Sequence, residues 1–110
     1  MRPSSAARKQ RYGKALYRYG IIPLLLLLEE YEKKEDYMEC GLIRDAIQDR
    51  VDYINKVSHM GEDFNLPRHI SEVDGHEKDY WSTQEENFKR NVKNYVQAIK
   101  ELVDDQVYSQ

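Results

Sequence analysis

The segment RKQRYGKALYRYG, residues 8–20, mixes basic side chains with tyrosines. Basic side chains contact phosphates and tyrosine rings stack on bases, so this mixture is typical of nucleic-acid binding. The alternative is a tyrosine-lined helix packed on the core of its own chain, because Tyr12, Leu16 and Tyr19 follow one another at steps of four and three. We favour the second interpretation and keep the first as the alternative. The nucleic-acid-binding candidates are Arg8, Lys9, Arg11, Lys14 and Arg18.

Charge is distributed unevenly along the chain. Residues 1–28 contain six basic residues and no acidic one, whereas the remainder contains 11 basic and 20 acidic residues. The two parts therefore carry charges of +6 and −9, which give the net charge of −3. The basic part is expected to attract a phosphate backbone or an acidic protein surface, or to dock on the acidic part of the same chain.

The residues that most often catalyse reactions or bind metals are scattered. His59, His69 and His76 lie 10 and 7 residues apart, and with Cys40 they match no zinc-ligand spacing. The sequence has no glycine-rich phosphate loop, no nucleophile motif and no Glu-x-x-His pattern of di-iron bundles. We therefore expect a protein without enzymatic activity, cofactor or metal.

The single cysteine and the leucine run bear on location. One cysteine cannot form an internal disulfide, which fits a reducing compartment such as the cytoplasm. The apolar run at residues 21–28 is shorter than the roughly 20 residues that span a bilayer, and acidic residues follow it directly. We expect a cytoplasmic protein, or a virion component if a phage encodes it, without membrane contact.

Periodicity predicts the elements that position these residues. We expect a single all-α domain over residues 1–110, built around an antiparallel helical hairpin at 21–57. A basic helix at 1–20 precedes the hairpin, an irregular segment at 58–81 follows it, and a last helix occupies 82–106. The four helices are expected near residues 5–19, 23–35, 37–57 and 83–105, because capping residues, the helix-ending Gly20 and Pro23 in a first turn lie at these limits.

The apolar residues predict the core. Five consecutive leucines, Leu24 to Leu28, cover every side of a helix, so that helix is expected to be central. The next helix carries an apolar stripe at steps of three and four, formed by Ile43, Ala46, Ile47, Val51, Ile54 and Val57. The irregular segment is expected to pack through Phe64, Leu66, Ile70 and Trp81. The last helix has a short heptad seam, formed by Phe88, Val92, Tyr95, Ile99 and Leu102.

The start of the third helix carries a recognisable pattern, read as Asp36-Tyr37, Cys40-Gly41, Ile43, Arg44-Asp45 and Ile47. This order resembles the UVR motif, a helical hairpin of bacterial nucleotide-excision-repair subunits and some Clp-protease regulators. Met38 stands where the family has Glu, and Cys40-Gly41 stands where it has two alanines. The resemblance covers about residues 24–50 and implies a hairpin for protein contact that has no catalysis of its own.

The same residue types suggest how such a hairpin is held. Asp36 is expected to cap the second arm, and Tyr37 to close the apolar end against the first. Small residues at positions 40 and 41 are expected to let the two helices approach closely. Arg44 and Asp45 are expected to bond across to neighbouring carboxylates or amides.

The functional expectation is a small protein–protein interaction module. Nine tyrosines suit half-buried surfaces and interfaces, and the last helix is apolar over a wider stripe than one neighbour needs. Small helical chains of phages and mobile elements often serve as inhibitors, adaptors or virion components, which is an analogy at the level of the fold. We expect a homo-oligomer or a stable contact with another protein, and the partner-binding candidates are Tyr95, Phe88, Val92, Ile99 and Tyr17.

Overall fold

The computed structural model describes residues 3–58, 64–73 and 86–105, with the side chains of 86–90 excepted. Most of these residues are helical, and none of them forms a strand. The all-α prediction is therefore confirmed. The elements are α1 (Ser5–Tyr19), α2 (Ile21–Lys33), α3 (Tyr37–Val57), the short 3₁₀ helix η1 (Ile70–Glu72) and α5 (Glu86–Asp104).

Local signals set the helix limits. The Ser4 hydroxyl accepts a hydrogen bond from the backbone N–H of Ala7 at 3.2 Å and caps α1. Gly20 ends α1 with φ +88°, a conformation that favours glycine, and α2 begins at the next residue. The Asp36 carboxylate accepts from the N–H of Glu39 at 3.4 Å and caps α3. A one-residue corner and a short turn thus connect the first three helices.

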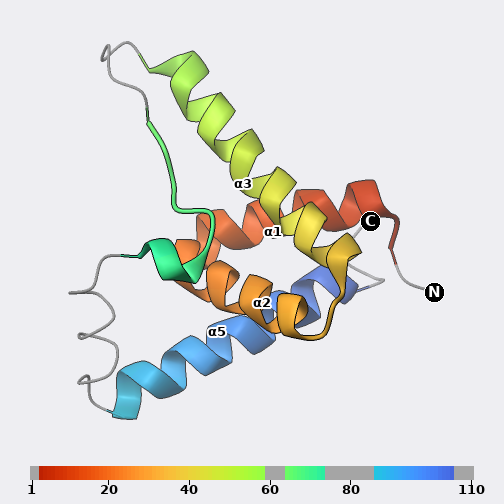
Figure 1. The fold of residues 1–110 in the computed structure, drawn as a ribbon, viewed down its shortest axis with the longest axis vertical. Helices are drawn as coiled ribbons and strands as arrows, with labels where there is room; N and C mark the ends of the chain where they lie inside the picture. Colours follow the sequence, from red (N-terminus) through yellow and green to blue (C-terminus); the bar gives the residue numbers. More distant parts are fainter. Residues whose placement is uncertain (1–2, 59–63, 74–85, 106–110) are drawn as a thin grey trace.

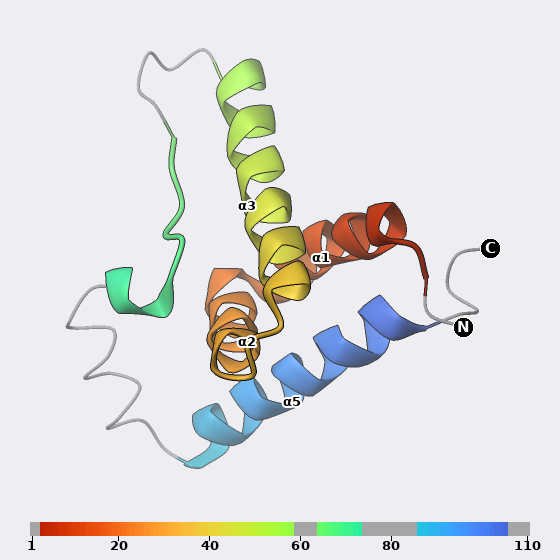
Figure 2. The same cartoon turned by 45° about the vertical axis from the view of Figure 1, so that its right-hand side comes forward.

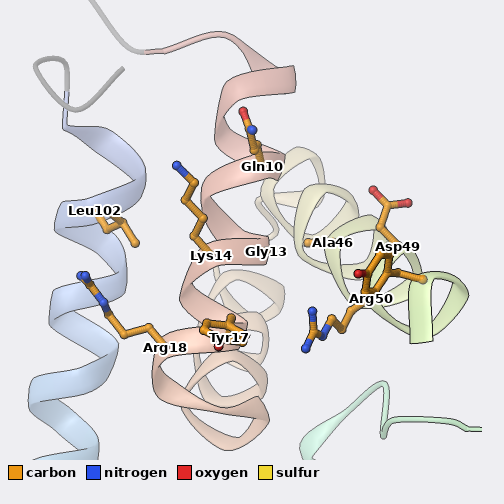
Figure 3. A pocket seen from close by; sticks show the side chains of 10 residues that line it. Gln10, Gly13, Lys14, Tyr17, Arg18, Ala46, Asp49, Arg50 and Leu102 are labelled. Carbon is orange, nitrogen blue, oxygen red and sulfur yellow. The ribbon is translucent and has the colours of Figure 1, made fainter. Parts of the chain in front are cut away.

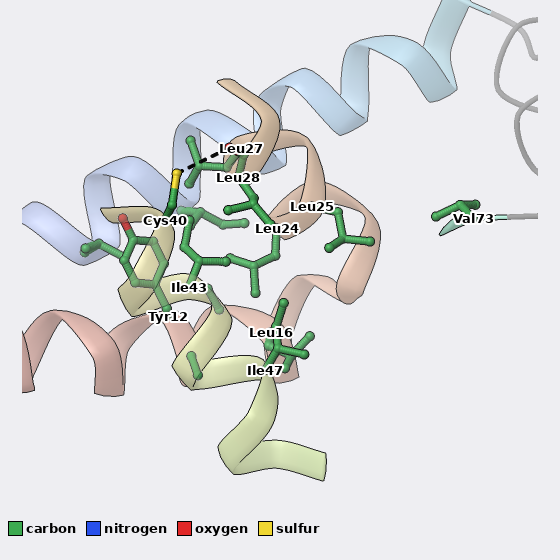
Figure 4. Close-up of a cluster of buried hydrophobic side chains, with 14 residues drawn as sticks. Tyr12, Leu16, Leu24, Leu25, Leu27, Leu28, Cys40, Ile43, Ile47 and Val73 are labelled. Atoms are coloured by element: carbon green, nitrogen blue, oxygen red, sulfur yellow. Dashed lines mark hydrogen bonds between the residues drawn. The ribbon is translucent and has the colours of Figure 1, made fainter. Parts of the chain in front are cut away.

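The leucine run forms the centre of the core. Leu24, Leu25, Leu27 and Leu28 are fully buried, and Leu26 is partly exposed. Helix α2 contacts α1, α3, η1 and α5, so the prediction that it is central is confirmed. Figure 4 shows these leucines gathered with side chains from α1 and α3; Val73, the residue that follows η1, lies at the edge of this cluster.

Helix α3 runs back along α2 and then extends beyond it. Figure 1 shows the two helices in opposite directions, with α5 against the other side of α2 and the end of α3 projecting outwards; Figure 2 shows the same projection. The apolar stripe is buried from Ile43 to Val51, but Ile54 is only partly buried and Val57 is 51% exposed. The expectation that the stripe is core to its end is wrong, because the other helices end before the last turns of α3.

Two details of the hairpin also differ from expectation. Tyr37 is 67% exposed and does not close the apolar end. A Cβ added at Gly41 would meet no atom within 4 Å, so this glycine is not needed for close helix approach. Cys40 is fully buried as expected, and Arg44 reaches Glu32 of α2 at 2.7 Å.

The segment between α3 and α5 packs through residues 64–73. Leu66 and Ile70 lie against the core as predicted, and Val73, which was not predicted, is buried in it. The Asn55 side chain accepts from the N–H of Phe64 and donates to its carbonyl, which ties this segment to the end of α3. The predicted contact of Trp81 lies outside the described residues.

Candidate functional site

The basic helix α1 is held by a buried ion network. Arg8 Nε donates to Glu39 Oε1 of α3 at 2.8 Å, and its Nη1 donates to the carboxylate of Asp104 at the end of α5. Arg8 and Glu39 are only 3% and 2% exposed. Burial alone would lower the pKa of Arg8, but the hydrogen bonds and charges of Asp104 and Glu39 raise it. The network therefore joins three helices through one permanently charged guanidinium.

Tyr12 completes this network. Its hydroxyl donates to Glu39 Oε2 at 2.5 Å, so both carboxylate oxygens of Glu39 accept from α1. Burial raises the pKa of Tyr12, and the hydrogen bond to Glu39 raises it further. Sequence reasoning treated Glu39 only as part of a helix cap, because nothing local indicates that its side chain turns inward.

Tyr12→Phe is expected to lower the stability of the domain. It is also expected to make that stability fall less steeply as the pH rises. The variant removes a hydrogen bond to a charged group, which is worth about 1.5–3 kcal/mol. Because the folded state raises the pKa of Tyr12 above its ordinary value of 10.0, its contribution is complete below pH 10 and is lost as the pH rises above 10. Denaturant unfolding between pH 8 and 11.5 measures how the free energy of unfolding changes with pH. A difference of one bound proton between the folded and unfolded states changes it by about 1.4 kcal/mol per pH unit.

The matched control is Tyr17→Phe, which removes a hydroxyl from an exposed tyrosine on the same helix. Equal pH slopes in Tyr12→Phe and the wild type would contradict a network role for Tyr12.

Other cations of α1 also bind the acidic part of the chain. Arg11 Nη1 donates to the carbonyls of Val103 and Asp105 at 3.0 and 2.5 Å, which holds the end of α5. Lys9 Nζ lies 3.0 Å from a carboxylate oxygen of Asp49 on α3. Three cations of α1 thus bind groups of their own domain: Arg8, Lys9 and Arg11. Arg8 and Arg11 are also buried, so the prediction that these two residues bind nucleic acid is wrong. Lys14 and Arg18 are exposed.

A groove of about 600 Å³ crosses α1 where Gly13 lacks a side chain (Figure 3). A Cβ added at Gly13 would meet no atom within 4 Å, so the groove is open at this point. Ala46 of α3 lines one side and Leu102 of α5 the other. Figure 3 shows Lys14 and Arg18 directed towards the α5 side and Arg50 on the α3 side. We call this feature the Gly13 groove; its other lining residues are Gln10, Tyr17, Asp49 and Tyr53.

Two exposed tyrosines flank Arg50 at the α3 side of the Gly13 groove. The Arg50 guanidinium carbon lies 5.4 Å from the ring centroid of Tyr17 and 5.9 Å from that of Tyr53. Tyr17 is 78% exposed and Tyr53 is 58% exposed. Cation–π attraction restrains these side chains while their outer surfaces face solvent. Tyr17 was a candidate from the sequence, but Arg50 and Tyr53 were not. Their spacing of three residues could have indicated them, because it places both on one helix face beside the apolar stripe.

The remaining partner-binding candidates lie elsewhere. Val92 and Ile99 are buried against the core of their own chain, and Tyr95 stacks on Tyr19 of α1 with ring centroids 5.4 Å apart. Tyr95 is nevertheless 41% exposed. The side chain of Phe88 lies outside the described residues. The structure does not bring this set together with Tyr17.

A serine, a histidine and a carboxylate form a chain beside η1. The Ser71 hydroxyl lies 2.9 Å from His69 Nδ1, and His69 Nε2 lies 2.7 Å from Glu32 Oε1. His69 Nδ1 also accepts from the backbone N–H of Ser71 at 3.1 Å, which is an N-cap of η1. Glu32 in turn binds Arg44. We interpret this chain as a tether of η1 to the hairpin.

A second, smaller hollow of about 290 Å³ lies between α2 and α5. Glu30 and Lys100 at its edge are 2.6 Å apart and neutralise each other. Its position beside the core helix and its paired charges make it a weaker candidate than the Gly13 groove.

Within residues 3–58, 64–73 and 86–105, no three His, Cys, Asp or Glu side chains are grouped to hold a metal ion. His59 and His76 lie outside these ranges. No helix in the described part of the chain has the length and apolar character needed to cross a membrane.

Comparison with protein-family models, curated proteins and solved structures finds no match to this chain.

Proposed function

We propose that this chain is a small non-catalytic interaction module that binds another protein in the Gly13 groove. The observation that carries the proposal is the pair of exposed tyrosines, Tyr17 and Tyr53, restrained by partly buried Arg50 beside an open groove. Tyrosine and arginine are enriched among the residues that dominate binding energy at protein interfaces. Restraining them before binding reduces the entropy lost on association.

The rest of the domain supports the same class of function. The buried network fixes α1 against α3, so the two walls of the groove are held at a set distance. The resemblance of residues 24–50 to the UVR hairpin also favours protein contact. Within this class, we propose an inhibitor, adaptor or virion component of a phage or mobile element, by analogy with other small helical chains.

The test is affinity capture from the native cell with the purified chain as bait. The double variant Tyr17→Ser/Tyr53→Ser is expected to retain the fold, since both side chains are exposed. The amount of partner protein that it captures is expected to fall by at least about tenfold. Nuclease treatment before capture is expected to leave the partner bound.

The matched control is Tyr37→Ser/Met38→Ser, which removes two exposed apolar side chains at the start of α3, away from the groove. It is expected to capture the same proteins as the wild type. Equal capture by the groove variant and the control would refute the proposed function, and capture abolished by nuclease would favour nucleic-acid binding.

A further inference from the structure

We infer that the Gly13 groove accepts a short acidic segment of the partner, with one apolar side chain flanked on both sides by carboxylates. This inference rests on the proposed function and adds the chemical class of the bound segment. It follows from three features of the groove: its apolar floor, the cations on its two opposite sides and the acidic residues beyond its edge.

The floor of the groove suits one apolar side chain. Gly13 and Ala46 are the smallest residues that line the groove, so they leave depth between α1 and α3. The ring of Tyr17 stands next to this opening (Figure 3). An aliphatic or aromatic side chain placed over Gly13 is expected to contact these surfaces and leave water.

The cations of the groove are placed on both sides of that floor. Lys14 and Arg18 are directed towards α5, and Arg50 lies towards α3 beside Tyr17. The single acidic residue lining the groove, Asp49, is paired with Lys9 at 3.0 Å. The groove therefore presents positive charge at two separated places, although the whole chain carries −3. Carboxylates on both sides of a central apolar residue match this distribution.

The surroundings of the groove favour a short segment over a nucleic-acid strand. Asp45, Asp49 and Asp52 follow one another along α3 at steps of four and three, and all three are exposed. A continuous phosphate backbone that follows α3 would meet these carboxylates, whereas a short peptide places its charges only at the groove. Arg50 also lies over the rings of Tyr17 and Tyr53, which leaves each ring fewer faces for base stacking.

The experiment uses the full chain and four defined probes followed by amide NMR shifts. The first probe is a short glycine–serine peptide with one tryptophan flanked on each side by glutamates. The second replaces the glutamates with lysines, the third replaces the tryptophan with serine, and the fourth is oligothymidylate of matched length. We expect the first probe alone to give saturable shifts at Gly13, Ala46 and Leu102, and its affinity to fall several-fold when salt is raised.

Two pairs of variants locate the binding. Arg18→Gln/Arg50→Gln removes one cation from each side of the groove and is expected to weaken the first probe about tenfold, roughly the loss expected for interface arginines. Lys33→Gln, a control on α2 that pairs with Glu29 outside the groove lining, is expected to change its affinity less than about twofold. Gly13→Leu fills the floor and is expected to abolish binding, whereas Gly13→Ala retains most of it. Amide spectra of each variant verify the fold.

Three results would overturn the inference: no shift at the groove, equal binding of the lysine peptide, or tighter binding of oligothymidylate at the same residues. If Tyr17→Ser/Tyr53→Ser abolishes protein capture while the glutamate peptide fails to bind, the groove binds a partner of other chemistry and only this inference fails. If capture is unaffected by that variant, the proposed function itself fails.

Discussion

Leu27→Asp is expected to unfold the domain. Leu27 is fully buried in α2, which contacts every other described helix. The substitution removes a packed side chain, at about 2–5 kcal/mol, and places a carboxylate where water is excluded, which adds further cost. Domains of this kind are stable by only about 5–15 kcal/mol, so little or no folded protein is expected. Circular dichroism during thermal unfolding measures the loss.

The neighbouring residue provides the control. Leu26 belongs to the same leucine run but is partly exposed and lies near Lys93 and Lys100 at the small α2–α5 hollow. Leu26→Asp is expected to remain folded with a lower melting temperature, because the new carboxylate reaches water and two amines. A cooperative melt of Leu27→Asp at the wild-type temperature would show that α2 is not the centre of the core.

Glu39→Gln is expected to have the second-largest effect. The carboxylate of Glu39 accepts from both Arg8 and Tyr12 inside the domain. Without its charge, Arg8 keeps only Asp104 as a charged partner, and the buried guanidinium is poorly compensated. Removing one partner of a buried ion pair costs about 3–5 kcal/mol. Chemical denaturation at neutral pH measures this loss.

Glu32→Gln is the control for the loss of a carboxylate in an ion pair. Glu32 also binds two side chains, Arg44 and His69, but at the partly exposed side of the hairpin. Its effect is expected to stay within about 1 kcal/mol. The double variant Arg8→Met/Glu39→Leu is expected to regain much of the stability that Glu39→Gln loses, because no buried charge remains. A loss below about 1 kcal/mol in Glu39→Gln would refute the network's role.

Sequence predicted the helices well because their limits depend on local chemistry. Ser4 and Asp36 cap helices through their own side chains, and Gly20 adopts a positive φ that other residues avoid. The central place of α2 was equally predictable, since a helix that is apolar on all sides has to be surrounded. These properties need no knowledge of which helices become neighbours.

The site was less predictable because it depends on pairing between helices. Arg8 and Glu39 are 31 residues apart, and neither sequence context distinguishes a buried charge from a solvated one. The Gly13 groove likewise combines Tyr17 of α1 with Arg50 and Tyr53 of α3. The position of Gly13 over an open space follows only from the crossing of α1 and α3.

The contact between Arg8 and Asp104 has a consequence for synthesis of the chain on the ribosome. These residues are 96 positions apart, and Arg11 is bound by carbonyls of the same distant end. At about 5–20 residues per second, α1 waits several seconds for these acceptors after it is made. During that interval a nascent chain exposes two cations and the leucine-rich helix, which is the kind of surface that chaperones recognise. Expression of this protein is therefore expected to depend on how quickly translation passes through its last helix.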